Sequence, residues 1–253
     1  MGPIMTFIPV ARVINLDRST ERLATCGPRL TAAGIYWQRH AATAPTSLEE
    51  ALSHPLYRSA TMRKLHGRDM SRGEIGCFLS HMAAMKSALA VGTPLALILE
   101  DDALPFDGAK IALEALSHWL TNTPEATVDW LHLSRSAESW SRPLATVSGF
   151  GIRRTYRPPW CLSASLYTRK GMQDFLRHVD LYGMDRPVDV ALRVCFCRSA
   201  RAAVLDAPIF GENGSESTID SAGERPVGMT KIRQWRRKAP EYAFAAWNRW
   251  RSA

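Results

Sequence analysis

A run of five apolar residues, Leu95 to Leu99, leads directly into three consecutive acids, Glu100, Asp101 and Asp102. A short and continuously apolar segment is typical of a parallel β-strand that is covered on both faces. In open parallel sheets, ligands bind in the crevice beyond the carboxyl ends of the strands. The run therefore predicts a buried strand, and it places three carboxylates at the edge of the sheet where ligands bind.

Strand-like and helix-like segments alternate along the rest of the chain. The helix that starts at Ser71 has the clearest beginning, because Ser71 and Glu74 are spaced as reciprocal caps, and it stops at Gly92. Residues 41–68 show no clear period and are expected to form a loop or short helices. Strands are expected at 7–16, from 35 onward, and at 95–99, 128–133, 162–167 and 202–205, with further helices at 19–33, 108–120, from 168 onward and at 188–196. This alternation predicts an α/β fold with an open, mostly parallel sheet flanked by helices.

Composition predicts one folded domain followed by a basic tail. Of the 253 residues, 46% are apolar, which is enough for a full-sized core. Residues 225–253 hold eight Lys and Arg against the single acid Glu241, so this segment carries seven of the eight net positive charges. We therefore divide the chain into a domain at 1–224 and a helical tail at 225–253. Because the positive charge is confined to the tail, we expect no nucleic-acid partner.

Cysteine usage and hydropathy indicate a cytoplasmic protein. The five cysteines form no Cys-x-x-Cys pair, and an odd number of free thiols is typical of the reducing cytosol. No apolar run approaches the roughly 18–20 residues that cross a bilayer, and the N-terminus lacks the features of a signal peptide.

The three acids after the apolar run predict a metal site. Neighbouring carboxylates repel one another and raise one another's pKa unless a cation or hydrogen-bond donors offset their charge. If the strand conformation continues for two residues, Glu100 and Asp102 point to the same side and Asp101 to the other. Two oxygen ligands suit Mg²⁺ or Mn²⁺, which commonly bridge carboxylates to nucleotide phosphates. The alternatives are a solvated turn, or acids paired with nearby arginines.

Other polar residues are weaker candidates for binding. Asp17, Arg18 and Arg22 follow the first expected strand, where they would meet a nucleotide or simply begin a solvated helix. Ser217 and Thr218 lie in a Gly- and Ser-rich loop that would donate hydrogen bonds to phosphate or serve only as a connection.

Asp189 and His81 both fall in expected helices. Asp189 follows Pro187 at a helix start, where capping of the helix dipole is the simpler role. His81 lies inside the helix that begins near Ser71, where a packed or hydrogen-bonded histidine is more common than a catalytic one.

The tail mixes tryptophan with cations. Two short helices are expected, at 230–238 and 241–251, with Pro240 between them. Trp247 and Trp250 lie among Arg249 and Arg251, a mixture that suits the headgroup zone of an anionic membrane. The tail would hold the protein on the inner face of the membrane, near a lipid-linked acceptor, or would pack its aromatic side chains on the domain.

Five segments occur together in a recognisable order. They are residues 13–19 (VINLDRS) with Glu21-Arg22, residues 71–77 (SRGEIGC) running into Ser80-His81, residues 97–102 (LILEDD), residues 187–189 (PVD) and residues 217–219 (STI). In this order they resemble glycosyltransferase family 25, the lipooligosaccharide galactosyltransferase family that also contains collagen galactosyltransferase domains. The resemblance implies a GT-A fold and inverting transfer of a hexose, usually galactose, from a UDP-sugar to a saccharide hydroxyl, in lipopolysaccharide or lipooligosaccharide biosynthesis.

The resemblance also implies roles for individual residues. Glu100 and Asp102 would act as the metal-facing and ribose-facing acids of a DxD-like element, while Arg18 and Arg22 would lie near the nucleotide. Inverting transfer needs a carboxylate that takes the proton of the acceptor hydroxyl, for which Asp189 is the first choice and Asp101 the second.

Two other function classes fit an acidic cluster after a strand. A metal-dependent phosphohydrolase would carry further acids or histidines for a second metal ion, and none is conspicuous at another strand end. A non-catalytic module that binds a nucleotide sugar or a saccharide would keep the fold without turnover, and the intact acidic triplet argues against it.

Overall fold

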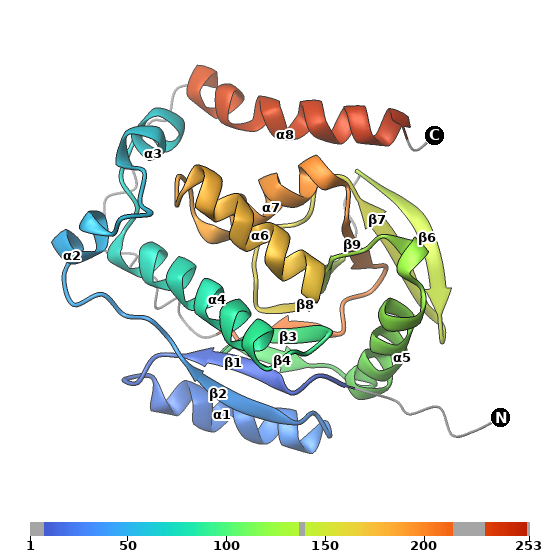
Figure 1. The fold of residues 1–253 in the computed structure, drawn as a ribbon. Helices are drawn as coiled ribbons and strands as arrows, with labels where there is room; N and C mark the ends of the chain where they lie inside the picture. Colours follow the sequence, from blue (N-terminus) through green and yellow to red (C-terminus); the bar gives the residue numbers. More distant parts are fainter. Residues whose placement is uncertain (1–7, 137–139, 215–230, 252–253) are drawn as a thin grey trace.

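The computed structural model describes residues 8–136, 140–214 and 231–251, and its centre is a sheet of eight strands (Figure 1). The strand order is β2-β1-β3-β8-β5-β9-β7-β6. The sheet strands are β1 (Ala11–Asn15), β2 (Trp37–Ala41), β3 (Leu95–Glu100), β5 (Trp130–Ser136), β6 (Ser141–Val147), β7 (Phe150–Thr155), β8 (Ala164–Thr168) and β9 (Ala202–Leu205). A separate two-stranded sheet pairs β4 (Ala103–Pro105) with β10 (Phe210–Glu212).

Six of these eight strands point in the same direction, which confirms the mostly parallel sheet. β1 is parallel to both β2 and β3, and β5 is parallel to β9. β8 runs antiparallel between β3 and β5, and β7 runs antiparallel to β9 and β6. The hairpin of β6 and β7 was not predicted. It turns at Ser148 and Gly149, which both have positive φ, as tight hairpin turns require.

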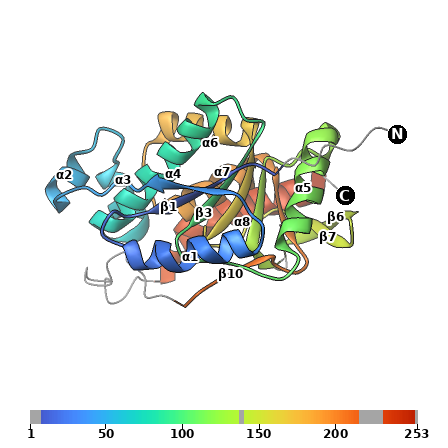
Figure 2. The same cartoon turned by 90° about the horizontal axis from the view of Figure 1, so that it is seen from below.

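Helices cover both faces of the sheet. On one face lie α1 (Thr20–Ala32) and α5 (Ala109–Asn122), and on the other α4 (Arg72–Ala90), α6 (Arg169–Tyr182) and α7 (Val188–Ser199) (Figures 1 and 2). Along β3, Ala96 and Ile98 pack into the core under α4, whereas Leu95, Leu97 and Leu99 pack into the core under α1 and α5. Because both faces of β3 are buried, its whole run is apolar, as predicted.

Local signals set the starts of several helices. At the start of α4, the Glu74 amide donates to Ser71 Oγ over 3.1 Å and the Ser71 amide donates to Glu74 Oε2 over 2.8 Å, so the predicted reciprocal cap is confirmed. The segment without a clear period contains two short helices, α2 (Leu48–Ser53) and α3 (Ser59–His66). A single turn of 3₁₀ helix, Pro124–Ala126, follows α5.

The C-terminal segment forms one helix, α8 (Lys231–Arg251), that contacts α7 and α3. The predicted break at Pro240 is wrong. A proline inside a helix costs about 3 kcal/mol because a hydrogen bond is lost and the ring clashes with the preceding turn. Glu241 and Ala245 are buried on the packed face, so tertiary contacts offset this cost. Within the described ranges, no helix combines the length and apolar character needed to cross a bilayer.

Candidate functional site

A pocket of about 590 Å³ opens beyond the carboxyl ends of β1 and β3. One wall follows β1 and β2 and includes Arg18, Arg22 and the start of α4. The acidic triplet forms the floor. The other wall comes from residues 160–162, the start of α7 and Glu212 of β10. The pocket therefore lies at the sheet edge that the sequence predicted.

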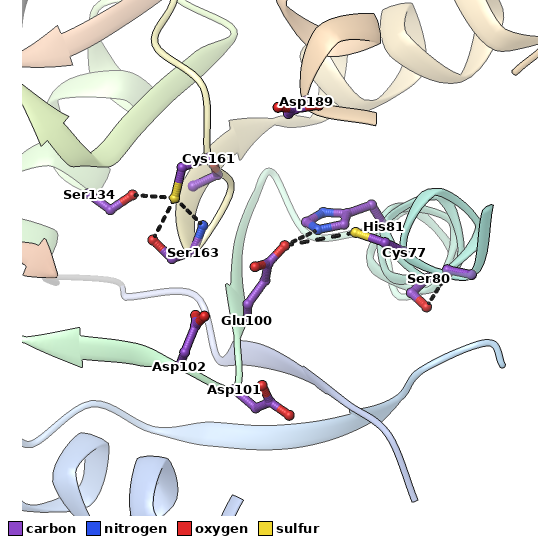
Figure 3. A network of polar contacts seen from close by, with 12 residues as sticks. Cys77, Ser80, His81, Glu100, Asp101, Asp102, Ser134, Cys161, Ser163 and Asp189 are labelled. Atoms are coloured by element: carbon purple, nitrogen blue, oxygen red, sulfur yellow. Dashed lines mark hydrogen bonds and ion pairs between the residues drawn. The ribbon is translucent and has the colours of Figure 1, made fainter. Parts of the chain in front are cut away.

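The three acids diverge at the end of β3. Glu100 Oε1 lies 3.0 Å from His81 Nε2 of α4. Asp101 Oδ2 accepts a hydrogen bond from Asn15 Nδ2 at 2.7 Å, and its Oδ1 lies 2.6 Å from a nitrogen of Arg22. Residues 101 and 102 form a turn, yet Glu100 and Asp102 still point to the same side while Asp101 points away from them (Figure 3). The alternative in which arginine pairs with these acids thus holds for Asp101.

Asp102 is a carboxylate whose charge is poorly compensated. Its Oδ2 lies 3.3 Å from Arg22, but its Oδ1 is buried and has no hydrogen-bond partner within the described residues. Burial, together with the nearby charge of Glu100, raises the pKa of Asp102 to about 6, although Arg22 opposes the rise. A cation beside this oxygen would offset the free-energy cost of burying the charged carboxylate. Carboxylate oxygens are the ligands that hard divalent ions such as Mg²⁺ and Mn²⁺ prefer, so the chemistry of Glu100 and Asp102 suits such an ion.

A second group of donors shares Glu100. Cys77 Sγ, His81 Nε2 and a carboxylate oxygen of Glu100 all lie within 4.8 Å of one another. Cys77 and His81 are one helical turn apart on α4 and both face the end of β3 (Figure 3). Thiolate and imidazole suit softer ions such as Zn²⁺. Sequence reasoning missed Cys77, although the spacing of four residues between Cys77 and His81 was visible.

Arginines surround the pocket. Arg18 and Arg22, which the sequence placed near a nucleotide, both line it. Three further arginines of the lining were not anticipated, and they are Arg68, Arg72 and Arg135. Arg68 is held by Glu74 at 2.5 and 2.6 Å, and Arg135 lies 2.6 Å from Glu212. Guanidinium groups suit a polyanionic ligand such as a diphosphate, although Arg22, Arg68 and Arg135 each also pair with an acid of the same pocket.

The remaining predicted residues fall in different places. Asp17 is exposed, pairs with Arg39 and does not line the pocket. Asp189 lines the pocket at the first turn of α7, and its Oδ1 accepts a hydrogen bond from the Val190 amide at 2.8 Å. Burial raises the pKa of Asp189, and the charge of Glu100 adds to this effect. Ser217 and Thr218 lie outside the described residues.

No sequence pattern predicted the part of the pocket wall around Cys161. Cys161 has φ 82°, a strained value for a residue other than glycine, and its thiol lies 2.8 Å from Glu212 Oε1. His132 Nε2 donates to the Cys161 carbonyl at 2.7 Å. Glu212 reaches this wall because β10 pairs with β4, the strand that follows the acidic triplet. Residues far apart in the sequence therefore form this wall of the pocket.

Comparison with known proteins identifies the class of this protein. Residues 9–147 match the model of "Glycosyltransferase family 25 (LPS biosynthesis protein)", so the class is a glycosyltransferase. This chain belongs to glycosyltransferase family 25. Its open sheet with flanking helices and a C-terminal helix is the GT-A-like architecture that the resemblance implied.

Two individual proteins are also similar. The chain is 30% identical over 132 residues to "Probable inactive glycosyltransferase 25 family member 3" of Rattus norvegicus, a match that covers 52% of this chain and 23% of that protein. The chain thus spans less than a quarter of the length of this relative. A solved structure, described as a glycosyltransferase involved in the glycosylation of the major capsid of PBCV-1, matches with a TM-score of 0.30 and 9% identity, over 68% of this chain and 66% of that one.

Proposed function

We propose that this protein transfers a hexose, with galactose as the first choice, from a UDP-sugar to a saccharide hydroxyl with inversion. The observation that carries the proposal is the pair Glu100 and Asp102 on the floor of a pocket lined by arginines, with one buried oxygen of Asp102 unsatisfied by the described residues. The description of the family as an LPS biosynthesis protein supports lipopolysaccharide or lipooligosaccharide as the class of product.

The donor would bind along the wall formed by the ends of β1 and β2. Arg18 and Arg22 lie on this wall, and Arg68 and Arg72 extend it to α4. Guanidinium groups pair with phosphate oxygens in bidentate geometry, so they would orient the diphosphate and neutralise part of its charge. Asp17 lies outside the pocket and would have no direct role in binding.

Glu100 and Asp102 would hold a divalent cation, Mn²⁺ or Mg²⁺. When bound, such an ion supplies positive charge beside the diphosphate that leaves the sugar. His81 fixes the carboxylate of Glu100 through the 3.0 Å contact, and Arg22 holds Asp101 and Asp102 in place from the other side. These contacts keep the ligand carboxylates in position before the donor arrives.

Asp189 would be the base. The bond between the anomeric carbon and the diphosphate breaks with its electron pair going to the diphosphate, the acceptor oxygen bonds to the opposite face of that carbon, and the acceptor proton passes to Asp189. A raised pKa suits a carboxylate that must take up a proton. Asp101 is less suited because Asn15 and Arg22 occupy its two oxygens.

A non-catalytic binding protein is the second candidate, because the rat relative carries "probable inactive" in its name. Incubation with UDP-galactose, UDP-glucose and Mn²⁺, with and without saccharide acceptors, separates these functions. A transferase releases UDP in an acceptor-dependent way, whereas a binding protein binds UDP in calorimetry and releases none. A phosphohydrolase, the third class, would cleave a simple phosphate ester, which a transferase leaves intact.

The tail offers a proposal about location. Residues 1–224 would form the transfer domain, and 225–253 would place it on the cytoplasmic face of an anionic membrane. Trp247 and Trp250 are exposed on α8, with their ring centroids 5.6 Å apart, beside the exposed Arg249 and Arg251. Cations near an anionic surface contribute about 1 kcal/mol each. The full chain should pellet with anionic but not neutral vesicles and release in high salt. Failure to bind anionic vesicles at low salt contradicts this proposal.

A further inference from the structure

Trp160 is a large aromatic side chain that is partly exposed to solvent in the pocket. It is 42% exposed and lines the pocket wall beside Cys161. By contrast, Trp130, Tyr156 and Tyr167 of the neighbouring strands and loop are fully buried in the core. An exposed indole loses little by remaining in water, but it gains when an apolar surface covers it. Its position in the pocket indicates a contact with a ligand.

Trp160 belongs to the same side of the pocket as Asp189. Figure 3 shows Cys161, the next residue, and Asp189 on the far side of Glu100 and Asp102 from Asp101. Arg22 contacts Asp101, which points the other way. Trp160 also contacts Arg193 of α7, the helix that carries Asp189 in its first turn. A sugar resting on Trp160 would therefore lie on the side of the pocket that holds the proposed base.

The backbone of this segment is fixed. His132, which is buried in β5, donates to the Cys161 carbonyl, and Cys161 adopts a positive φ that costs about 1 kcal/mol or more. Strain of this kind persists only where the surrounding structure imposes it. The indole of Trp160 is thus presented at a defined place rather than on a loose loop.

A buried ion pair supports the indole from behind. The guanidinium carbon of Arg193, on α7, lies 5.4 Å from the centroid of the Trp160 ring. Arg193 has a side chain that is 1% exposed, and its Nε lies 3.3 Å from Glu241 Oε2, whose side chain is 2% exposed. An uncompensated buried guanidinium would be costly, so the ion pair with Glu241 stabilises Arg193 in its place beside the ring. α8 is thereby connected to the wall of the pocket.

We infer that Trp160 is the platform on which the acceptor sugar ring rests, and that Glu241 of α8 is a positioning residue that holds the platform through Arg193. The inference rests on the proposed transfer function and names the part of the site that binds the acceptor. A hexopyranose has one face made of C–H groups, which packs on an aromatic ring, while its hydroxyl groups project from the edge towards polar groups. On this platform a hydroxyl at the edge can meet Asp189.

The test compares Trp160→Ala with Tyr36→Ala. Tyr36 is also a surface aromatic, 79% exposed, but lies just before β2, away from the pocket. The probes are the methyl glycosides of glucose, galactose and N-acetylglucosamine, of which the best acceptor is used. Trp160→Ala should raise the acceptor KM roughly tenfold or more, which corresponds to about 1.4 kcal/mol, and leave the Kd for UDP unchanged. Trp160→Phe should restore part of the loss, and Tyr36→Ala should change neither constant.

Fluorescence gives a readout that does not depend on turnover. Adding the methyl glycoside to the protein with UDP and Mn²⁺ should change tryptophan emission in the wild type and in Tyr36→Ala, but not in Trp160→Phe. An unchanged acceptor KM in Trp160→Ala, or an emission change that persists in Trp160→Phe, overturns the inference. If the wild type binds UDP and gives the emission change but never transfers sugar, the platform stands and the proposed function fails.

The role of Glu241 is tested separately. Glu241→Gln should raise the acceptor KM several-fold while the Kd for UDP stays constant, because its ion pairs are with Arg193 and Arg157, which lie outside the proposed donor wall. If this variant is too unstable to assay, Glu241→Asp keeps the charge and should give a smaller rise in the same constant. A variant that folds with a normal acceptor KM removes Glu241 from the inference.

Discussion

Replacing Asp102 with asparagine should make the metal-free protein more stable and should abolish the stabilisation that Mn²⁺ gives the wild type. In the folded protein the pKa of Asp102 rises from an ordinary 3.8 to about 6, mainly because the carboxylate is buried. A shift of about two pKa units corresponds to about 3 kcal/mol of unfavourable free energy whenever the carboxylate is charged. Because the folded pKa is the higher one, the cost is absent below pH 4, grows between pH 4 and 6, and is constant above pH 6.

The assay is thermal unfolding with and without Mn²⁺ at pH 8 and at pH 4. Without metal at pH 8, Asp102→Asn should unfold roughly 5–10 °C above the wild type, and at pH 4 the two should coincide. Mn²⁺ should raise the melting temperature of the wild type at pH 8 but not that of Asp102→Asn. Asp107→Asn, an exposed acid five residues later, is the matched control and should behave as the wild type.

Two results would refute this reasoning. If Asp102→Asn were no more stable than the wild type without metal, the buried carboxylate would not carry the expected penalty. If Mn²⁺ stabilised Asp102→Asn as much as the wild type, the metal would bind elsewhere.

Three further predictions follow from the same site and its surroundings. Asp189→Asn should keep the Kd for UDP and lower kcat by roughly 100-fold or more, as expected for loss of a general base, and an equal loss of UDP affinity in calorimetry would place Asp189 among the donor-binding residues instead. Titration of the wild type with Co²⁺ should give a thiolate-to-metal absorption that Cys77→Ser lacks, while activation by Mn²⁺ stays unchanged in that variant. Loss of Mn²⁺ activation would instead assign the metal to the group of Cys77, His81 and Glu100. Burial lowers the pKa of His132 to about 4, so its neutral form stabilises the fold above pH 6.5, and this contribution of up to about 3 kcal/mol is lost as the pH falls to 4. The free energy of unfolding of His132→Gln should therefore change less with pH between 6.5 and 4 than that of the wild type, and identical pH profiles would contradict a buried neutral His132.

Features of the fold that depend on local sequence were predictable. The apolar run of β3 and the reciprocal cap of Ser71 and Glu74 need only their own neighbours, and both are confirmed. The direction of β8 was not predictable, because the same buried pattern fits a parallel or an antiparallel strand. Continuity of α8 through Pro240 was missed because packing against α7 and α3 overrides a local signal.

The candidate site also combines residues that local sequence predicts with residues that only the tertiary structure brings there. Glu100 ends β3 and Asp102 follows it, while Arg18 and Arg22 come within seven residues of the end of β1. Their meeting at one sheet edge could therefore be predicted from the sequence. Trp160 and Glu212 reach the pocket only because β8 inserts beside β3 and β10 pairs with β4. No sequence pattern within residues 155–165 or 208–214 predicts that these two residues line the pocket. The wall around Trp160 and Glu212 could therefore not be predicted from the sequence, whereas Asp189 and the residues that follow β1 and β3 could.

Product analysis tests inverting transfer of galactose directly. The protein is incubated with UDP-galactose, Mn²⁺ and a methyl glycoside acceptor, and the products are followed by NMR. A β-galactoside should form in step with UDP, since the donor is an α-glycoside and a single displacement inverts the anomeric carbon. An α-linked product would contradict inversion. Release of free galactose alone, or UDP-galactose that binds and stays intact, would contradict transfer.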